Sequence, residues 1–252
     1  MKLVFEPKFL DCYCSDPAAS SRRLDHALEL MEKHYSFSGA LPAQNTDILL
    51  VHNDRHLNRV RMNRQVYEMA LLSAGAAIQA AEFAVKGEPA FALCRPPGHH
   101  ASPDGFWGFC YFNNISIAIE RLLQRRAIES AMIVDFDLHF GDGTNDHFES
   151  RTDVSYYHGN GHNGKNFIEN LKNHLDYSDG ELLAVSAGFD RHCDDWGRML
   201  STKDYGEIGR LLGDFAREKC EGRIFAVLEG GYNPLSLGEG LLAFLQGLEK
   251  TL

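Results

Sequence analysis

The sequence lacks the patterns that carry several common kinds of function. No stretch approaches the ~18 consecutive apolar residues that a membrane-spanning helix needs, so no such helix is expected. No P-loop, GxxxxGK followed by serine or threonine, is present to indicate nucleoside triphosphate binding. No serine or cysteine is arranged with a matched base, so the sequence does not favour covalent catalysis by such a nucleophile.

Cysteine is sparse. The six cysteines are scattered over 252 residues and do not form the dense framework of a small secreted domain, so we expect reduced thiols in a cytoplasmic protein. Cys12 and Cys14 have no second pair near them in the sequence that would complete a metal site. The N-terminal stretch is interrupted by Glu6, Pro7 and Lys8, which makes it a poor signal peptide.

Positive charge is in deficit, and this limits the class of partner. The chain has 25 Lys and Arg against 35 Asp and Glu, a formal net charge of -10. That balance argues against direct binding of a nucleic-acid backbone. An acidic surface can instead attract a cationic substrate toward a cleft. The oligomeric state cannot be read from the composition.

Apolar, strand-like runs alternate with amphipathic, helix-like runs. Strands are predicted at 90–94, 131–137, 153–158, 181–190 and 223–231, and helices at 20–35, 65–86, 113–128, 203–219 and 234–250. Ser20 or Ser21 would cap the first helix. This alternation predicts an α/β fold with a mostly parallel sheet that is covered on both faces. Because no linker or repeat is evident, residues 1–252 are expected to form one domain.

Polar side chains gather at the C-terminal ends of four predicted strands. They are His99 and His100 after the strand at 90–94, Asp135, Asp137 and His139 near the end of 131–137, Asp190 at the end of 181–190, and Tyr232 after 223–231. Ligands bind at this edge of an open α/β sheet, so these residues should converge on one site. Burying several carboxylates without a cation is costly, so a bound metal ion is expected there.

Asp137, His139 and Asp190 are the candidate metal ligands. Asp137 and His139 lie two residues apart, so their side chains point the same way from an extended segment. Three protein ligands with an open position are typical of a catalytic zinc site. Fe(II) or Co(II) could occupy the same set, because protein geometry alone rarely decides between these metals. Any one such aspartate is usually a capped turn or part of an ion pair, and only the set predicts a metal.

His99 and His100 are candidate catalytic residues. Asp135 and Asp142 flank the metal ligands in sequence and are natural partners for the two imidazoles. An aspartate that accepts a hydrogen bond from one imidazole nitrogen raises the basicity of the other nitrogen. Two such dyads beside an activated water could accept its proton and later protonate a leaving group. Adjacent histidines could otherwise form a hydrogen-bonded pair in the core.

Tyr232 follows two glycines at the same sheet edge. A phenol opposite the metal would stabilise the oxyanion of a tetrahedral intermediate, although most tyrosines in such turns only pack. The parts together are a Lewis acid, a water, a base, an acid and an oxyanion donor. They predict metal-assisted hydrolysis of an acyl group.

Five long stretches resemble the motif set of the zinc-dependent histone deacetylase family, which includes acetylpolyamine amidohydrolases and acetoin-utilisation proteins. They are RPPGHHA (95–101), GFCYFNN (108–114), VDFDLHFGDGT (134–144), SAGFD (186–190) and LEGGYN (228–233), in the family's order. Weaker similarity at 16–28, 49–57 and 67–78 extends the resemblance over most of the chain.

The resemblance implies an arginase/deacetylase-like fold, a three-layer α/β/α sandwich. It implies that zinc is held by Asp137, His139 and Asp190, and that K⁺ sits near residues 135–139. It also implies roles for the remaining positions. His100 would be the main general base and acid, and His99 its electrostatic partner, with Asp142 and Asp135 as the carboxylates that orient them. Tyr232 would polarise the acetyl carbonyl, and Gly108 and Phe109 would line a tunnel for an aliphatic amine stem.

The sequence departs from the family pattern at the rim of the predicted site. Only RMNRQ (61–65) separates two segments that usually bracket a longer loop. The stretch 158–181 is compressed and polar. His158 or His162 could face Phe109 across the tunnel, but a solvated Gly/Asn-rich loop is the favoured interpretation.

The segment after Asp190 bears on substrate choice. Trp196 stands at or beside the position where polyamine-selective relatives carry a glutamate, and Asp194 or Asp195 could substitute for that acid. Acetyl-lysine, an acetylated polyamine and a small acyl amide all remain candidate substrates.

Two alternatives to a deacetylase remain. A ureohydrolase on the same fold would need ligands for a second metal, but Gly141 and Gly188 stand where those ligands would be. A non-catalytic protein that binds acetylated ligands would be expected to have lost a metal ligand, a dyad member or Tyr232, and none is lost.

Overall fold

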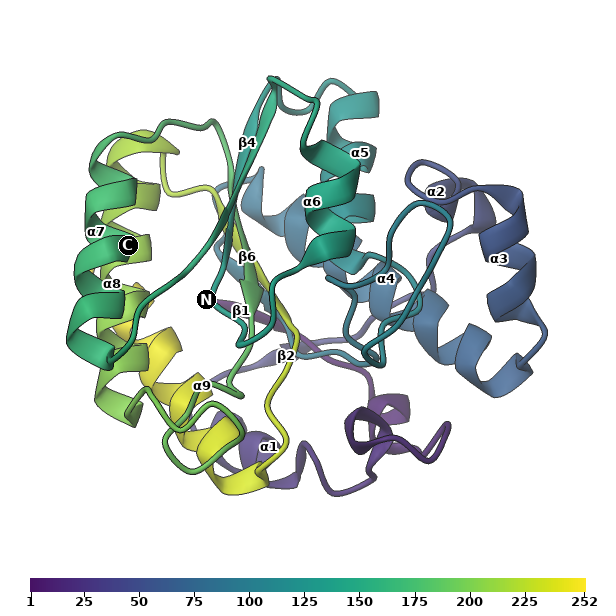
Figure 1. Ribbon diagram of the computed structural model, residues 1–252, viewed down its shortest axis with the longest axis horizontal. Helices are drawn as coiled ribbons and strands as arrows, with labels where there is room; N and C mark the ends of the chain where they lie inside the picture. Colours follow the sequence, from purple (N-terminus) through teal and green to yellow (C-terminus); the bar gives the residue numbers. More distant parts are fainter.

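The structure is a computed structural model that describes residues 1–252, and it is built on one sheet of seven strands (Figure 1). The strand order is β2-β1-β3-β7-β6-β4-β5, and every neighbouring pair is parallel. The strands are β1 Lys2–Val4, β2 Phe37–Ser38, β3 Ala90–Ala92, β4 Ala131–Asp135, β5 Val154–His158, β6 Leu183–Ala187 and β7 Ile224–Leu228.

Helices cover both faces of the sheet, as Figure 1 shows. α1, α7, α8 and α9 lie on one side, and α4 and α5 lie on the other with α6 beside the edge strand β5. The helices are α1 Asp25–Met31, α2 Asn45–Ile48, α3 Asp54–Arg61, α4 Arg64–Ala84, α5 Asn114–Gln124, α6 Asp142–Phe148, α7 Gly164–Asp176, α8 Thr202–Lys219 and α9 Pro234–Glu249. The predicted α/β class, parallel sheet and three layers are confirmed.

The central strands are buried along their whole length. Every residue of β4, β6 and β7 is buried, which is why these strands are apolar without alternation. β5 forms an edge, and only its first residue, Val154, is fully buried. The apolar runs therefore predicted the central strands well, and the structure ends each of them a few residues earlier than expected.

The strand order brings together the polar residues that follow four strands. β3, β7, β6 and β4 are neighbours in the sheet, although β3 and β7 are more than a hundred residues apart in sequence. Because all four strands are parallel, their C-terminal ends meet at one edge. The candidate site lies at this edge.

The N-terminal region differs from the prediction. α1 begins at Asp25, its N-cap residue is Leu24, and no side chain caps it, so the predicted cap by Ser20 or Ser21 is wrong. The residues before α1 include a short 3-10 helix, Pro17–Ala19, whose first turn is capped by the Asp16 carboxylate. β1 and β2 were not predicted, because strands of three and two residues leave no periodic signal.

The polar stretch 158–181 also differs from the prediction. It contains α7, which buries Phe167, Leu171 and Leu175, so the interpretation as a solvated loop holds only for its first few residues. Asn163 caps this helix by accepting a hydrogen bond from the Asn166 backbone N–H, at 2.9 Å. The many Asn and Gly residues before the apolar positions masked the helical period.

The glycines before α7 serve packing. The stretch GNGHNG (159–164) has the spacing GxGxxG between a strand and a helix, which elsewhere can bind a pyrophosphate. Here a Cβ on Gly159 or Gly161 would lie 2.5 or 2.7 Å from Phe167. A Cβ on Gly164 would lie 2.7 Å from the Asp204 carboxylate, which places negative charge where a phosphate would bind. These contacts explain the glycines without a nucleotide.

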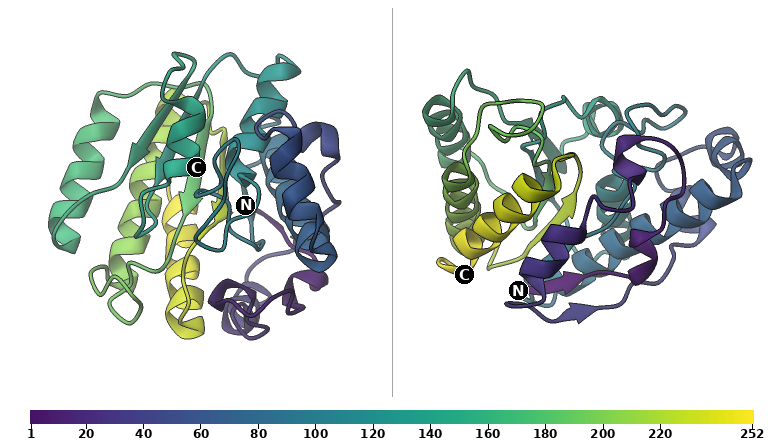
Figure 2. Two further views of the ribbon diagram at one scale, coloured as in Figure 1. Left: turned by 45° about the vertical axis from the view of Figure 1, so that its right-hand side comes forward. Right: turned by 90° about the horizontal axis from the view of Figure 1, so that it is seen from below.

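The two ends of the chain lie close together, as the right-hand view of Figure 2 shows, and the Met1 amino group pairs with Glu249 Oε1 at 3.0 Å. All six cysteines are free thiols. No helix combines the length and the apolar character that crossing a membrane would demand.

Candidate active site

The three predicted metal ligands converge from two strand ends. The donor atoms of Asp137, His139 and Asp190 all lie within 4.8 Å of one another. His139 Nδ1 is 3.3 Å from Asp137 Oδ1 and 3.1 Å from Asp190 Oδ2. Asp137 and Asp190 are almost completely buried, whereas the His139 side chain is partly exposed.

Backbone amides hold both candidate ligand carboxylates, and the His139 N–H also donates to Asp137 Oδ1 at 2.9 Å. Asp137 Oδ2 accepts a hydrogen bond from the Gly230 N–H at 2.7 Å, and Asp190 Oδ1 accepts one from the Leu138 N–H at 2.9 Å. The backbone comes so close that a Cβ at Gly188 would lie 2.1 Å from Asp137 Oδ2, and one at Gly230 would lie 2.5 Å from it. The glycines of the SAGFD and LEGGYN stretches are therefore required for this approach.

The donor atoms of the three residues fit a cation. Asp190 Oδ2 is buried and makes no hydrogen bond, although His139 Nδ1 lies 3.1 Å from it. Burial, and then the charge of Asp137, raise the pKa of Asp190 to about 6. The carboxylates of Asp137 and Asp190 raise the pKa of His139 to about 10, so the site attracts positive charge at its centre. Two carboxylates and an imidazole that share one point suit a divalent metal.

Both predicted dyads form. His99 Nδ1 lies 3.0 Å from Asp135 Oδ2, and His100 Nδ1 lies 2.6 Å from Asp142 Oδ1. Asp135 is fully buried, whereas the Asp142 side chain is 40% exposed at the start of α6. The two dyads thus have similar geometry in different surroundings.

The electrostatic surroundings of the two histidines differ. Burial opposes a charge on His99, but Asp137 and Asp135 outweigh it and raise its pKa well above the ordinary value. Burial and the charge on His99 lower the pKa of His100 to about 4. At neutral pH the arrangement favours a cationic His99 beside a neutral His100.

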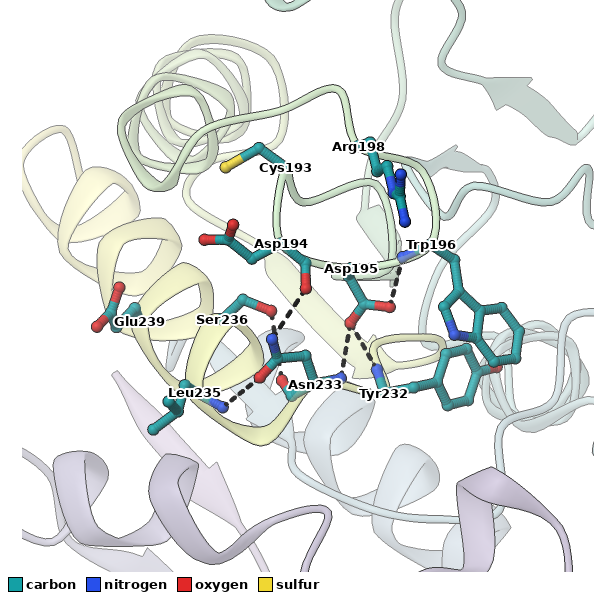
Figure 3. A pocket seen from close by; sticks show the side chains of 10 residues that line it. All are labelled: Cys193, Asp194, Asp195, Trp196, Arg198, Tyr232, Asn233, Leu235, Ser236 and Glu239. Atoms are coloured by element: carbon teal, nitrogen blue, oxygen red, sulfur yellow. Dashed lines mark hydrogen bonds between the residues drawn. The ribbon is translucent and has the colours of Figure 1, made fainter.

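Tyr232 reaches the same site from the turn after β7. Its backbone N–H and that of Asn233 donate to Asp195 Oδ2 at 2.7 and 2.8 Å, which holds the turn (Figure 3). The phenol ring stacks on Trp196, with ring centroids 4.0 Å apart. Burial raises the pKa of Tyr232, so the hydroxyl keeps its proton and can donate it in a hydrogen bond.

Gly108 and Phe109 form part of the wall of a pocket over these groups. Both residues have positive φ, 57° for Gly108 and 66° for Phe109, and a Cβ at Gly108 would lie 2.5 Å from His100 Cδ2. Left-handed backbone is unusual for phenylalanine, and such strain is often found at functional sites. It places the Phe109 ring edge-on to Tyr232, with centroids 5.9 Å apart.

The pocket has a volume of about 280 Å³ and combines the candidate catalytic groups with apolar walls. Its lining residues are Pro97, His99, His100, Trp107, Gly108, Phe109, His139, Trp196, Gly230 and Tyr232. Such a pocket can hold a slim acyl-amine stem with its carbonyl near His139 and Tyr232.

The candidates for the opposite wall of the tunnel lie elsewhere. His158 Nε2 is 2.9 Å from the Asp137 carbonyl oxygen, and His162 lies exposed in the loop before α7, so neither faces Phe109. Trp196 lines the pocket instead. Asp194 and Asp195 do not line it. They border a wider hollow on the other side of Trp196 and Tyr232, two residues that line both spaces, and there Asp195 accepts hydrogen bonds from the Tyr232 turn (Figure 3).

Arg191 binds backbone carbonyl oxygens in the region where K⁺ was expected, near residues 135–139. Arg191 is buried and its Nε–H donates to the carbonyl oxygens of Phe136 and Asp137, at 3.1 and 2.9 Å. Its Nη2 donates to the Gly159 carbonyl oxygen at 2.9 Å. A K⁺ ion near residues 135–139 stays a prediction, since some backbone acceptors there are already used by this guanidinium.

Three residues that hydrogen-bond to the candidate site were not predicted from the sequence. Tyr156 donates its hydroxyl to Asp135 Oδ2 at 2.9 Å, Trp107 donates its indole N–H to Asp142 Oδ2 at 2.7 Å, and Glu229 accepts from the Gly98 N–H at 2.7 Å. Only Glu229 and Trp107 carried a signal, because Glu229 lies inside the LEGGYN stretch and Trp107 directly precedes GFCYFNN. Nothing in the sequence connected Tyr156 with Asp135.

Known proteins resemble this chain in sequence and in fold. The sequence profile of the histone deacetylase domain matches residues 17–168 and 165–248. A probable deacetylase of Methanothermobacter thermautotrophicus is 31% identical over 81% of this chain and 76% of its own length. A histone deacetylase-like amidohydrolase of Pseudomonas aeruginosa is 30% identical over 85% of this chain and 71% of its own length.

A further relative and a solved structure show the same similarity. The polyamine deacetylase HDAC10 of Danio rerio is 29% identical over 82% of this chain and 36% of its own length. The crystal structure of the HDA15 HD domain superposes with a TM-score of 0.87 at 22% identity, covering 99% of this chain and 89% of that one. Because the profile match spans most of the sequence, the chain belongs to the histone deacetylase family.

Proposed function

We propose that this protein is a metal-dependent amidohydrolase that removes acetyl or other acyl groups from amines such as acetyl-lysine or acetylated polyamines. The whole chain, residues 1–252, serves as its catalytic domain. One observation carries the proposal: the three candidate metal ligands, both Asp–His dyads and the Tyr232 phenol meet at one sheet edge beside an apolar pocket. Those are the parts that hydrolysis of an unactivated amide requires.

Asp137, His139 and Asp190 would hold the metal. A zinc ion, or Fe(II) or Co(II), would supply Lewis acidity toward the acyl carbonyl and lower the pKa of the attacking water. The chain's contribution is to keep both carboxylates in place through the Gly230 and Leu138 amides.

His100 would act as general base and then as general acid. Asp142 accepts the Nδ1–H hydrogen bond, so Nε2 is left free to take a proton from the attacking water. The water oxygen forms a bond to the acyl carbon, the C–N bond breaks, and His100 returns the proton to the departing amine nitrogen. His99, held by Asp135, would contribute positive charge close to the developing oxyanion.

Tyr232 would stabilise the acyl oxygen. Its protonated hydroxyl would donate a hydrogen bond to that oxygen as negative charge develops there. One such donor typically stabilises the transition state by about 3 kcal/mol. Phe109, Trp107 and Trp196 would enclose the apolar stem of the substrate and keep bulk water away.

The test is an assay of purified protein, loaded with zinc, against acetyl-lysine peptides, acetylputrescine, acetylspermidine and longer acyl-lysines. We expect release of free amine and of the carboxylic acid, loss of that release with a chelator, and recovery on adding metal back. The Asp190→Ala variant is the matched negative control. A zinc-loaded protein that binds these amides by calorimetry but hydrolyses none of them would be a non-catalytic binding protein instead.

A further inference from the structure

The two dyads differ in how their carboxylates are restrained. Asp135 is completely buried, and the Tyr156 hydroxyl, donated from β5, holds its Oδ2 at 2.9 Å. Asp142 is the first residue of the short helix α6, and its side chain is 40% exposed. An exposed carboxylate exchanges rotamers and water partners freely, so the pair with His100 needs a second restraint.

Trp107 supplies a restraint on Asp142. Its indole Nε1–H donates to Asp142 Oδ2 at 2.7 Å, while Asp142 Oδ1 faces His100 Nδ1 at 2.6 Å. An indole nitrogen can only donate, and a carboxylate is the strongest acceptor among side chains, so this bond has one direction. Each oxygen of Asp142 thus has one partner, and the carboxylate cannot turn without breaking both bonds.

Trp107 also covers the imidazole that Asp142 orients. The indole and His100 rings lie with centroids 3.9 Å apart at 34°. Trp107 is 54% exposed, whereas the His100 side chain is only 4% exposed, so the indole is the outer layer over the base. The next residue, Gly108, brings its backbone against the same ring.

We propose that Trp107 is a positioning residue for the general base, acting through Asp142 and His100. It completes a Trp107–Asp142–His100 chain on the exposed side of the site, as Tyr156 completes the chain through Asp135 to His99 on the buried side. The inference rests on the proposed function insofar as His100 is the base, but the hydrogen bond itself can be tested without turnover.

Kinetics of a double-mutant cycle test the role. Trp107→Phe keeps an aromatic ring over His100 and removes the donor. With Asp142 present we expect it to lower kcat about 10-fold with KM changed less than about 2-fold, a typical effect for one charge-assisted hydrogen bond in partial contact with water. In an Asp142→Ala background the same substitution should change kcat less than about 2-fold, because its target is gone.

Trp196→Phe is the matched control for this cycle. Trp196 lines the same pocket but stacks on Tyr232 and makes no contact with Asp142. Its effect should therefore be the same in both backgrounds. If Trp107→Phe also acts equally in both backgrounds, or raises KM alone, Trp107 serves only as a wall of the pocket and the proposal is overturned.

A spectroscopic measurement needs no activity. The chain has only two tryptophans, so a ¹H–¹⁵N spectrum contains two indole N–H signals that the two Phe variants assign. We expect the Trp107 signal downfield of the Trp196 signal, and moving upfield in Asp142→Ala. An unmoved signal would show that the bond to Asp142 is absent. A protein that shows the shift but hydrolyses no acyl amide would retain the bond and refute only the proposed function.

Discussion

His99 and His100 are adjacent in the chain but meet different charges. Three carboxylates surround His99, since Asp135 contacts its Nδ1 and Asp137 Oδ1 lies 3.7 Å from its Nε2, with buried Glu229 beneath its backbone. His100 faces the partly exposed Asp142, and its ring lies with its centroid 4.1 Å from that of His99. The same residue type is thereby suited to two tasks, one to carry a charge and one to exchange a proton.

Substitution of the two histidines should separate these tasks. We expect His100→Ala to lower kcat by ~10²–10⁴-fold, the usual contribution of a positioned proton-transfer group. His99→Ala should leave measurable activity, because it removes only a charge near the oxyanion. Steady-state kinetics of both variants with the best substrate, at equal metal content, measure the difference. If His99→Ala proves more damaging, the roles assigned to the two histidines are reversed.

At the scale of elements, the site depends on how closely the loops after β4, β6 and β7 approach each other. The loop after β6 passes Asp137 at Gly188, and the loop after β7 passes both ligand carboxylates at Gly230. Only backbone without a side chain allows these distances. The loops are therefore expected to tolerate almost no substitution at the two glycines.

Gly188→Ala should weaken metal binding strongly. The added Cβ would lie 2.1 Å from Asp137 Oδ2 and so must displace a ligand. We expect zinc affinity to fall ~10–100-fold, the scale seen when groups that orient metal ligands are disturbed. Competition with a chromophoric chelator measures this. Gly206→Ala in α8 is the control, because its Cβ would meet only Ala243 of α9, at 3.5 Å or more, and should leave metal affinity unchanged.

A second element-scale contact links the turn between α2 and α3 to the start of α5. His52 Nδ1 donates to the Ser102 carbonyl oxygen at 2.9 Å, and its Nε2 accepts from the Asn113 N–H at 2.9 Å. The accepting nitrogen must be unprotonated. Burial lowers the pKa of His52 to about 3, below the value of 6.5 expected for an unfolded histidine.

The buried, neutral His52 should make the free energy of unfolding depend on pH in the acid range. Below pH 6.5 the unfolded chain binds a proton at His52 that the folded chain refuses, so the free energy of unfolding falls as the pH is lowered toward 3. The slope from this group is at most ~1.4 kcal/mol per pH unit. Urea unfolding of metal-free protein at several pH values should show a shallower slope for His52→Gln than for wild type. Equal slopes would mean that His52 is already protonated in the folded state.

At the scale of the whole molecule, the sheet order brings residues from four strand ends to one centre with three ligands. A ureohydrolase-like pair of metals would need further carboxylates, yet Gly141 and Gly188 occupy those positions. With these two positions lacking carboxylates, the ligand set favours a single divalent ion at this centre.

We expect one tightly bound divalent metal per chain, and its loss in Asp190→Ala. Two carboxylates and one imidazole leave no spare ligand to replace the missing one. Elemental analysis of wild type and variant, after equilibration with zinc and removal of excess, gives the ratio. Two equally tight catalytic ions per chain would contradict this prediction and restore the ureohydrolase alternative.

The sequence by itself determined the fold class and the composition of the candidate site. Near-continuous apolar strands specify a buried parallel sheet, and chain direction alone places the ends of parallel strands at one edge. Asp137 with His139, and His99 with His100, are close in sequence, so their grouping did not depend on the fold. The same local reasoning failed for β1, β2 and α7, where elements are very short or their period is masked.

Only the tertiary structure decided what holds these groups in place. Tyr156 reaches Asp135 because β5 pairs with β4 in one particular register, and Arg191 reaches Phe136 and Gly159 through the packing of three loops. Trp107 meets Asp142 across 35 residues of chain. Such contacts join residues with no fixed spacing in sequence. They depend on distances that arise only when the strands are paired and the loops are packed.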